Sequence, residues 1–318
     1  MKIIEHINQA KETLFSFELL PPLKGHKISA IYKTIDNLME FNPSNVNITY
    51  HQEEVVYKKL ENGLLESKTV RKRPGTVAIA AAIKNRYPDL HVIPHIICGG
   101  FSKDSTEYAL IDLNFLGIHN LLVLRGDPPK TEHIFKAEAG GHKYAFELVE
   151  QIMDMNKGKY LDNDLQNTTA TDFSVGVAAY PEKHIEAPNI KTDLKYLKQK
   201  IDAGADYIVT QMFFDNQHYF KFVDKCRDEG ITVPIIPGIK PISKLSDIQL
   251  LPKVFNIDIP EALMKELDKC KTNKDAFQVG VEWGIKQSRE LKNYGVPGLH
   301  YFTIGVSDNI RQIAKEIF

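Results

Sequence analysis

The sequence predicts an α/β protein with a single-domain (β/α)8 (TIM) barrel fold. Eight short stretches rich in β-branched residues each precede a helical pattern, and strict alternation of this kind is typical of a parallel sheet. The 318 residues, 43% of them hydrophobic, suit one barrel. A doubly wound open sheet is the alternative fold, but neither G-x-G-x-x-G nor G-x-x-x-x-G-K-[ST] is present to support it.

In the first half of the chain, strands are expected over 13–19, 46–50, 91–98 and 120–124, and helices over 27–40, 70–85, 102–117 and 144–155. The first helix carries Ile28, Ile31 and Ile35, which share one helical face. Ser102 suits an N-cap, and Gly117 suits a helix end. Polar stretches near 51–68 and 156–172 are expected to be surface excursions of the single domain, 1–318.

In the second half, strands are expected over 173–179, 207–212, 233–237 and 300–304. Helices are expected over 192–203 and 217–229, in several pieces between 243 and 294, and from about 307 to the end. Gly204 and Gly230 follow the first two of these helices, at positions where glycine commonly ends a helix.

Composition argues against several classes of function. Forty basic and 41 acidic residues give a net charge of −1, which does not favour nucleic acid or an anionic membrane as a partner. The basic run Arg71–Arg73 is interpreted as a solvated loop, with a phosphate site as the less favoured alternative. Three scattered cysteines without a C-x-x-C pair predict neither disulfides nor a bound metal.

The chain also lacks the features of a membrane or secreted protein. Glu5 and His6 stand where a signal peptide has its apolar core, and no apolar run approaches the length of a membrane span. A cytoplasmic location is therefore expected.

Candidate functional residues follow the strands, because a barrel places its chemistry at the carboxyl ends of its strands. Glu18 ends the first strand, directly before Pro21 and Pro22, which cannot continue it. The ends of the other strands bring further polar side chains to the same mouth: Thr49, His95, Arg125, Asp127, Tyr180, His184 and Gln211.

Each of these residues also has a purely structural interpretation. His95 could be a core histidine, Arg125 could pair with Asp127, and Gln211 could cap the backbone. Glu18 and Asp127 could also be the two carboxylates of a barrel hydrolase acting on glycosides. Few aromatic residues are available at the mouth for sugar stacking, which counts against that alternative.

Six motifs occur in an order that closely resembles methylenetetrahydrofolate reductases, in their short bacterial form with a catalytic domain only. They are Phe17–Pro22, Leu124–Asp127, Ala178–Glu182, Asp202–Asp206, Thr210–Asp215 and Pro237–Ile239. The resemblance covers nearly the whole chain. It implies a barrel with tightly, non-covalently bound FAD and with NADH or NADPH as co-substrate. It also implies ping-pong reduction of 5,10-methylenetetrahydrofolate to 5-methyltetrahydrofolate for methionine synthesis, and a homo-oligomer.

The resemblance also implies roles for individual residues. Glu18 matches the general acid that protonates N10 of the folate. Asp127 matches the aspartate beside flavin and pterin, and Gln211 matches a glutamine that binds the folate. Positions matching FAD contacts are Thr49, His95, Arg125, Gly126, Asp127, Ala145, Tyr180, His184, Asp193 and Lys200. An acid for a weakly basic amine needs a raised pKa, which the neighbouring leucines are expected to give Glu18.

The chain departs from the family pattern at four places. Leu19-Leu20 replaces a common Phe-Phe, Leu245 stands where a phenylalanine meets the substrate, and Val306 aligns near an arginine that meets the folate. The segment 50–72 is longer and more charged than in the simplest members. A folate- or flavin-binding barrel without turnover remains an alternative to the reductase.

Overall fold

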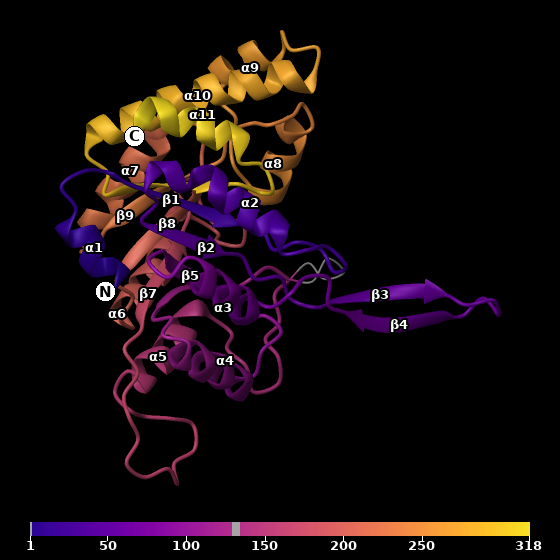
Figure 1. Ribbon diagram of the computed structural model, residues 1–318, viewed down its shortest axis with the longest axis vertical. Coiled ribbons are helices and arrows are strands. Elements are labelled where there is room, and N and C mark those ends of the chain that lie inside the picture. Colours follow the sequence, from indigo (N-terminus) through magenta and orange to yellow (C-terminus); the bar gives the residue numbers. More distant parts are fainter. Residues whose placement is uncertain (1, 129–133) are drawn as a thin grey trace.

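The computed structural model describes residues 2–128 and 134–318 and confirms the barrel (Figure 1). Eight parallel strands close in the order β1, β10, β9, β8, β7, β6, β5, β2. Their bounds are β1 Leu14–Leu19, β2 Asn45–Ile48, β5 His91–Ile97, β6 Asn120–Leu124, β7 Ser174–Ala179, β8 Tyr207–Met212, β9 Ile235–Ile239 and β10 Gly298–Phe302.

Helices cover the outside of the barrel (Figure 1). They are α2 Ser29–Leu38, α3 Thr76–Arg86, α4 Lys103–Phe115, α5 Ala145–Met155, α6 Ile190–Asp202, α7 Asn216–Asp228, α8 Asp247–Phe255, α9 Glu261–Leu267, α10 Asn273–Tyr294 and α11 Asp308–Ile317, with a 3-10 turn at Met39–Phe41. Helix α2 buries an apolar stripe of Ile31, Ile35 and Leu38 in the main core. This is the helical face that the sequence predicts.

The two ends of the barrel interior differ in polarity. At the amino-terminal end, Ile93, Tyr207 and Ile236 pack together with Ile3 and Ile7 of α1 (Ile3–Gln9). Helix α1, which the sequence analysis missed, therefore closes that end with apolar side chains. Toward the carboxyl ends of the strands the interior becomes polar, and this asymmetry leaves only one end available for chemistry.

The excursion near 51–68 is not the polar loop that the sequence predicts. It forms an antiparallel hairpin of β3 (Glu54–Lys59) and β4 (Leu65–Val70), which projects sideways from the barrel (Figure 1). Because β4 extends to Val70, helix α3 begins at Thr76, six residues later than expected. The second excursion, 156–172, contains no helix or strand, as predicted.

Other differences concern the ends of elements. Strand β9 begins two residues later than predicted, and β10 begins two residues earlier. Cys98, Cys226 and Cys270 are free thiols, as expected. Among the described residues, no group of histidine, cysteine or acidic side chains is arranged to hold a metal ion. No helix in the described ranges has the length and apolarity needed to cross a bilayer.

Candidate active site

Glu18 lies inside the barrel, near the carboxyl end of β1, with its side chain 14% exposed. One carboxylate oxygen is 3.3 Å from His95 Nε2 and 3.9 Å from His300 Nε2. The other accepts a 3.5 Å hydrogen bond from the Thr49 hydroxyl. Three strands, β1, β5 and β10, and the residue after β2 thus bring these four side chains together.

The expectation of a raised pKa for Glu18 is wrong. Burial raises the pKa of this carboxyl, but His95, His300 and Thr49 together lower it below its usual value. The sequence shows the neighbouring leucines but not these hydrogen-bond partners, which come from other strands. Glu18 is therefore ionised in the open site.

His95 is almost fully buried, and burial lowers its pKa to about 4 despite the nearby Glu18 carboxylate. The imidazole is therefore neutral at pH 7. Neither ring nitrogen has a hydrogen-bond partner with good geometry among the described residues. A buried polar group without a partner is costly, so an unpaired imidazole here is typical of a site that completes its hydrogen bonds with a ligand.

Threonines fix the backbone around Glu18. The Thr49 hydroxyl donates to the carbonyl of Leu19 at 2.7 Å, and the Thr303 hydroxyl donates to the carbonyl of Glu18 at 2.7 Å. Both bonds satisfy carbonyls at the end of β1, where Pro21 and Pro22 end the strand. The Glu18 side chain is consequently held on a rigid element.

His300 is a site residue that the sequence analysis missed. Its Nδ1 lies 2.9 Å from the Ser16 hydroxyl, and its Nε2 faces Glu18. The register of β10 sets His300 beside Ser16 and Phe302 beside Glu18. Side chains alternate between the two faces of a strand, so His300 shares the inward face. Residues two positions apart on a strand share a face, so counting back from Phe302 could have indicated that His300 points inward.

Asp127 lies at the rim of the mouth and is exposed. It follows Gly126, whose φ of +86° favours glycine and whose missing Cβ leaves room beside Ile97. The Asp127 carbonyl accepts a 2.9 Å hydrogen bond from Gln52 Nε2. Gln52 belongs to the segment before the hairpin, so this segment reaches across the mouth to β6.

Gln211 is the penultimate residue of β8 and is partly exposed. Its side-chain oxygen accepts a 2.9 Å hydrogen bond from the amide of Met212. This bond orients the amide group and leaves the side-chain NH2 group available to a ligand.

One structural interpretation of the sequence paired Arg125 with Asp127, and that interpretation is wrong. Its guanidinium makes two hydrogen bonds, of 2.6 and 2.7 Å, with the Glu186 carboxylate. This bidentate pair lowers the pKa of Glu186. Arg125 also lies over the ring of Phe135, 4.8 Å from its centroid.

Most of the other positions matched to FAD contacts lie beyond the ends of β6 and β7. Tyr180 and His184 make an edge-to-face contact at 4.6 Å, and the amide of His184 donates to Asp193 at 2.8 Å. Lys200 donates to the carbonyl of Ala178, and burial lowers its pKa to about 8. Ala145 is the first residue of α5. These residues lie in the loops and helices that follow β6 and β7.

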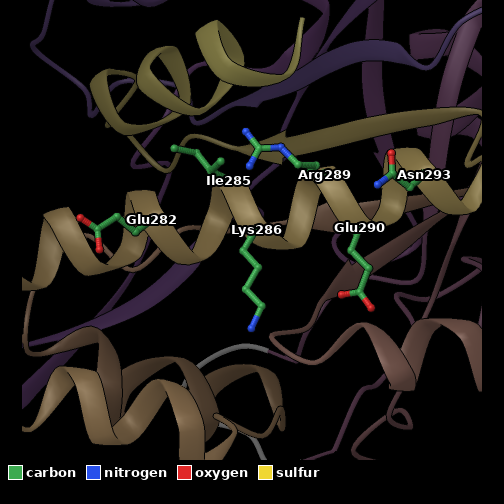
Figure 2. Close-up of a pocket in the computed structure, with 6 residues that line it drawn as sticks. All are labelled: Glu282, Ile285, Lys286, Arg289, Glu290 and Asn293. Carbon is green, nitrogen blue, oxygen red and sulfur yellow. The ribbon is translucent and has the colours of Figure 1, made fainter.

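A surface pocket of about 350 Å³ lies elsewhere, on the outside of α10. Figure 2 shows its lining side chains projecting from that single helix: Glu282, Ile285, Lys286, Arg289, Glu290 and Asn293. None of them is a predicted site residue. The charges of both signs on this helix face are those of a solvated surface.

Comparison with known proteins gives consistent results. A family model described as methylenetetrahydrofolate reductase matches residues 2–317. A 5,10-methylenetetrahydrofolate reductase of Pectobacterium carotovorum is 30% identical, with 91% of this chain and 85% of that protein aligned. The protein of Escherichia coli with the same name is 29% identical over the same shares.

Longer relatives match over only part of their length. A probable methylenetetrahydrofolate reductase (NADPH) of Caenorhabditis elegans is 31% identical over 99% of this chain, which spans 43% of that protein. The chain thus spans about half the length of such relatives. A solved structure from Clostridium thermocellum, 13% identical with a TM-score of 0.57, covers 98% of this chain and 96% of its own, and it supports the fold alone.

Proposed function

This chain belongs to the methylenetetrahydrofolate reductase family, and we propose that it reduces 5,10-methylenetetrahydrofolate to 5-methyltetrahydrofolate with FAD as its cofactor. The observation that carries the proposal is the position of Glu18, a single acid in the barrel interior facing His95 and His300. Family membership supplies the reaction, and this cluster supplies a group able to move the proton that the reaction requires.

Glu18 is the general acid of the proposal. It protonates N10 of the folate, which opens the five-membered ring to a reactive iminium. Its pKa is lowered in the open site, so substrate must raise it. A folate covering the mouth removes the remaining water from the carboxyl, and desolvation disfavours the charged form. His95 and His300 remain beside the proton and can exchange it with Glu18.

Asp127 has the complementary role. Its carboxylate lies exposed at the rim, where it can stabilise the positive iminium. Two carboxyls in contrasting environments, one buried and one solvated, are a common division between an acid and an electrostatic stabiliser. Gln211 offers its free NH2 group to the pterin.

The residues matched to FAD suit that cofactor. The unpaired ring nitrogens of His95 can form hydrogen bonds with the cofactor. The positive charges of Arg125 and Lys200 can offset the negative charge of the FAD pyrophosphate, and Arg125 also pairs with Glu186. Thr49, Ala145, Tyr180, His184 and Asp193 complete the set. When bound, FAD carries hydride from NADH or NADPH to the folate in two successive half-reactions.

The remaining features of the proposal rest on the family. The product supplies methyl groups for methionine synthesis, and the protein acts in the cytoplasm as a homo-oligomer. Relatives are named for either NADH or NADPH, so both reductants belong to the proposal.

Turnover of the purified protein tests this function. With FAD, NADH or NADPH and methylenetetrahydrofolate, we expect formation of 5-methyltetrahydrofolate. Asp127→Asn is expected to slow that reaction with folding unchanged. A protein that binds methylenetetrahydrofolate without reducing it would instead be the non-catalytic barrel. A protein that binds no flavin and cleaves glycosides would be the hydrolase.

A further inference from the structure

Two arginines at the base of the hairpin have no role in the proposed reaction. Arg71 and Arg73 lie between β4 and α3, in the segment interpreted from sequence chiefly as a solvated loop. Arg73 is partly buried and donates to the carbonyl of Pro21, three residues beyond Glu18. Burial raises the pKa of Tyr50, and the charge of Arg71 opposes that shift. The Arg73 contact therefore attaches this segment to the barrel mouth.

Neither guanidinium forms an ion pair with a carboxylate in the described part of the chain. Lys72, which lies between them, does form an ion pair: its ammonium is 2.5 Å from the Glu54 carboxylate. Burial lowers the pKa of Arg73, and the charge of Glu54 opposes that shift. The Arg73 guanidinium donates to a neutral carbonyl rather than to a carboxylate.

The amino terminus of α3 adds positive potential at the same place. Its N-cap is Gly75, which supplies no side-chain cap, and its first turn contains no acidic residue. The Arg71 guanidinium lies so close to Gly75 that a Cβ there would collide with it. A cation against the positive end of a helix is unfavourable unless an anion lies between or beside them.

This basic cluster lies near the proposed reaction centre. Thr49, next to Tyr50, hydrogen-bonds Glu18. Burial lowers the pKa of His51, and the charges of Arg73, Glu18 and Asp127 also act on it. The amide of Lys24 donates to the carbonyl of Lys72 at 2.8 Å and fixes the loop after β1 against the cluster.

We propose that Arg71, Arg73 and the amino terminus of α3 form an oxyanion-binding site for the charged end of a substrate whose ring lies at Glu18. This assignment rests on the proposed function. Guanidinium groups and free helix amides together suit a phosphate or a carboxylate. Both substrates offer such groups: the phosphates of the nicotinamide dinucleotide and the glutamyl carboxylates of the folate. Neither arginine is among the residues matched to FAD.

The test compares Arg71→Gln, Arg73→Gln and the double variant with Lys68→Gln. Lys68 is an exposed cation on the same hairpin and serves as the matched control. In the holoenzyme, the KM is measured for NADH, for NADPH, and for methylenetetrahydrofolate with one or five glutamates. Loss of a charge-assisted contact is expected to raise the affected KM about tenfold or more.

The two sources give different results. A dinucleotide pyrophosphate predicts a raised KM for the reductant alone. A glutamyl tail predicts a raised KM for the folate alone, with a larger effect for five glutamates. The proposal is overturned if the double variant keeps its KM for the reductant and its KM for the folate within about twofold of wild type, with flavin content and Tm unchanged. It is also overturned if Lys68→Gln has the same effect as the double variant.

A binding measurement separates failure of this site from failure of the reductase assignment. Calorimetry with sodium pyrophosphate, and separately with γ-linked triglutamate, requires no turnover. We expect at least one of them to bind the wild-type protein and Lys68→Gln, with affinity lost in the double variant. If the protein reduces no folate but this pattern holds, the site stands and the proposed function falls. If neither anion binds, or the double variant binds them equally well, the site is wrong.

Discussion

At the scale of single residues, the proposal depends on the neighbours of Glu18 rather than on Glu18 alone. The carboxyl is placed by β1, but its protonation is controlled by His95 from β5 and His300 from β10. A carboxylate held between two imidazoles can exchange a proton over short distances. This arrangement suits an acid that must be ionised in the open site and protonated when substrate is bound.

Glu18→Gln is expected to separate the two half-reactions. Reduction of the flavin by NADH or NADPH should stay within about threefold of wild type, and folate reduction should fall by roughly 100-fold or more, because the amide cannot donate the proton as an acid. Stopped-flow absorbance of the flavin measures both rates. Glu107→Gln, at a buried carboxylate that accepts the amide of Leu161, is the control. Equal losses in both half-reactions would refute the role of Glu18.

His95 is expected to make the fold sensitive to acid. Its pKa is about 4 in the folded protein and 6.5 for the free side chain. The folded state therefore binds fewer protons, so stability is lost as pH falls from about 6.5 toward 4. When the pH is lowered from 7 to 5, the free energy of unfolding falls for both proteins. The fall should be roughly 1–2 kcal/mol smaller for His95→Gln than for wild type.

Urea denaturation at several pH values measures this difference. His26→Gln, at an exposed histidine, is the control and should follow wild type. Parallel pH curves for wild type and His95→Gln would contradict the account of a buried neutral imidazole.

At the scale of elements, the sequence allowed some to be predicted well and others poorly. The barrel strands were predictable because burial on both faces requires continuous β-branched runs, as in Val175 and Val177 of β7. The hairpin was missed because its strands are exposed and charged, so burial imposes no pattern. Helix α1 was missed because seven residues are too few to establish a helical period.

Contact between α10 and the segment after β9 is expected to be intolerant of a single methyl group. A Cβ at Gly280 would collide with the backbone of Ile242, whereas one at Gly284 would meet mainly the flexible end of Ile313. Both substitutions gain the same helix propensity. Gly280→Ala should therefore lose about 1–3 kcal/mol relative to Gly284→Ala in chemical denaturation. Equal stabilities would show that the loop can move away.

The hairpin is expected to be dispensable for the fold. Among the described strands, β3 and β4 pair only with each other, and most of their side chains are exposed. Replacing residues 55–69 with a short Gly-Ser linker should change Tm by less than about 3 °C in calorimetry, because little apolar area is lost. A large drop in Tm would mean that the hairpin stabilises the barrel.

At the scale of the whole molecule, closure of the barrel makes the site. Residues from 18 to 300 meet at one mouth because all eight strands are parallel. The sequence allowed the strand-end residues to be predicted, since their position follows from strand order alone. It did not allow the pairing of Arg125 with Glu186, 61 residues away, because loop conformation decides that contact. The pKa of Glu18 could not be predicted either, because closure of the barrel brings His95 and His300 beside it.

The most direct test of the central claim is an anaerobic titration of the purified, FAD-containing protein. Addition of NADH or NADPH should bleach the flavin absorbance, and subsequent methylenetetrahydrofolate should restore it with formation of one equivalent of 5-methyltetrahydrofolate. A protein that binds no FAD would contradict the claim. So would a reduced flavin that methylenetetrahydrofolate leaves bleached.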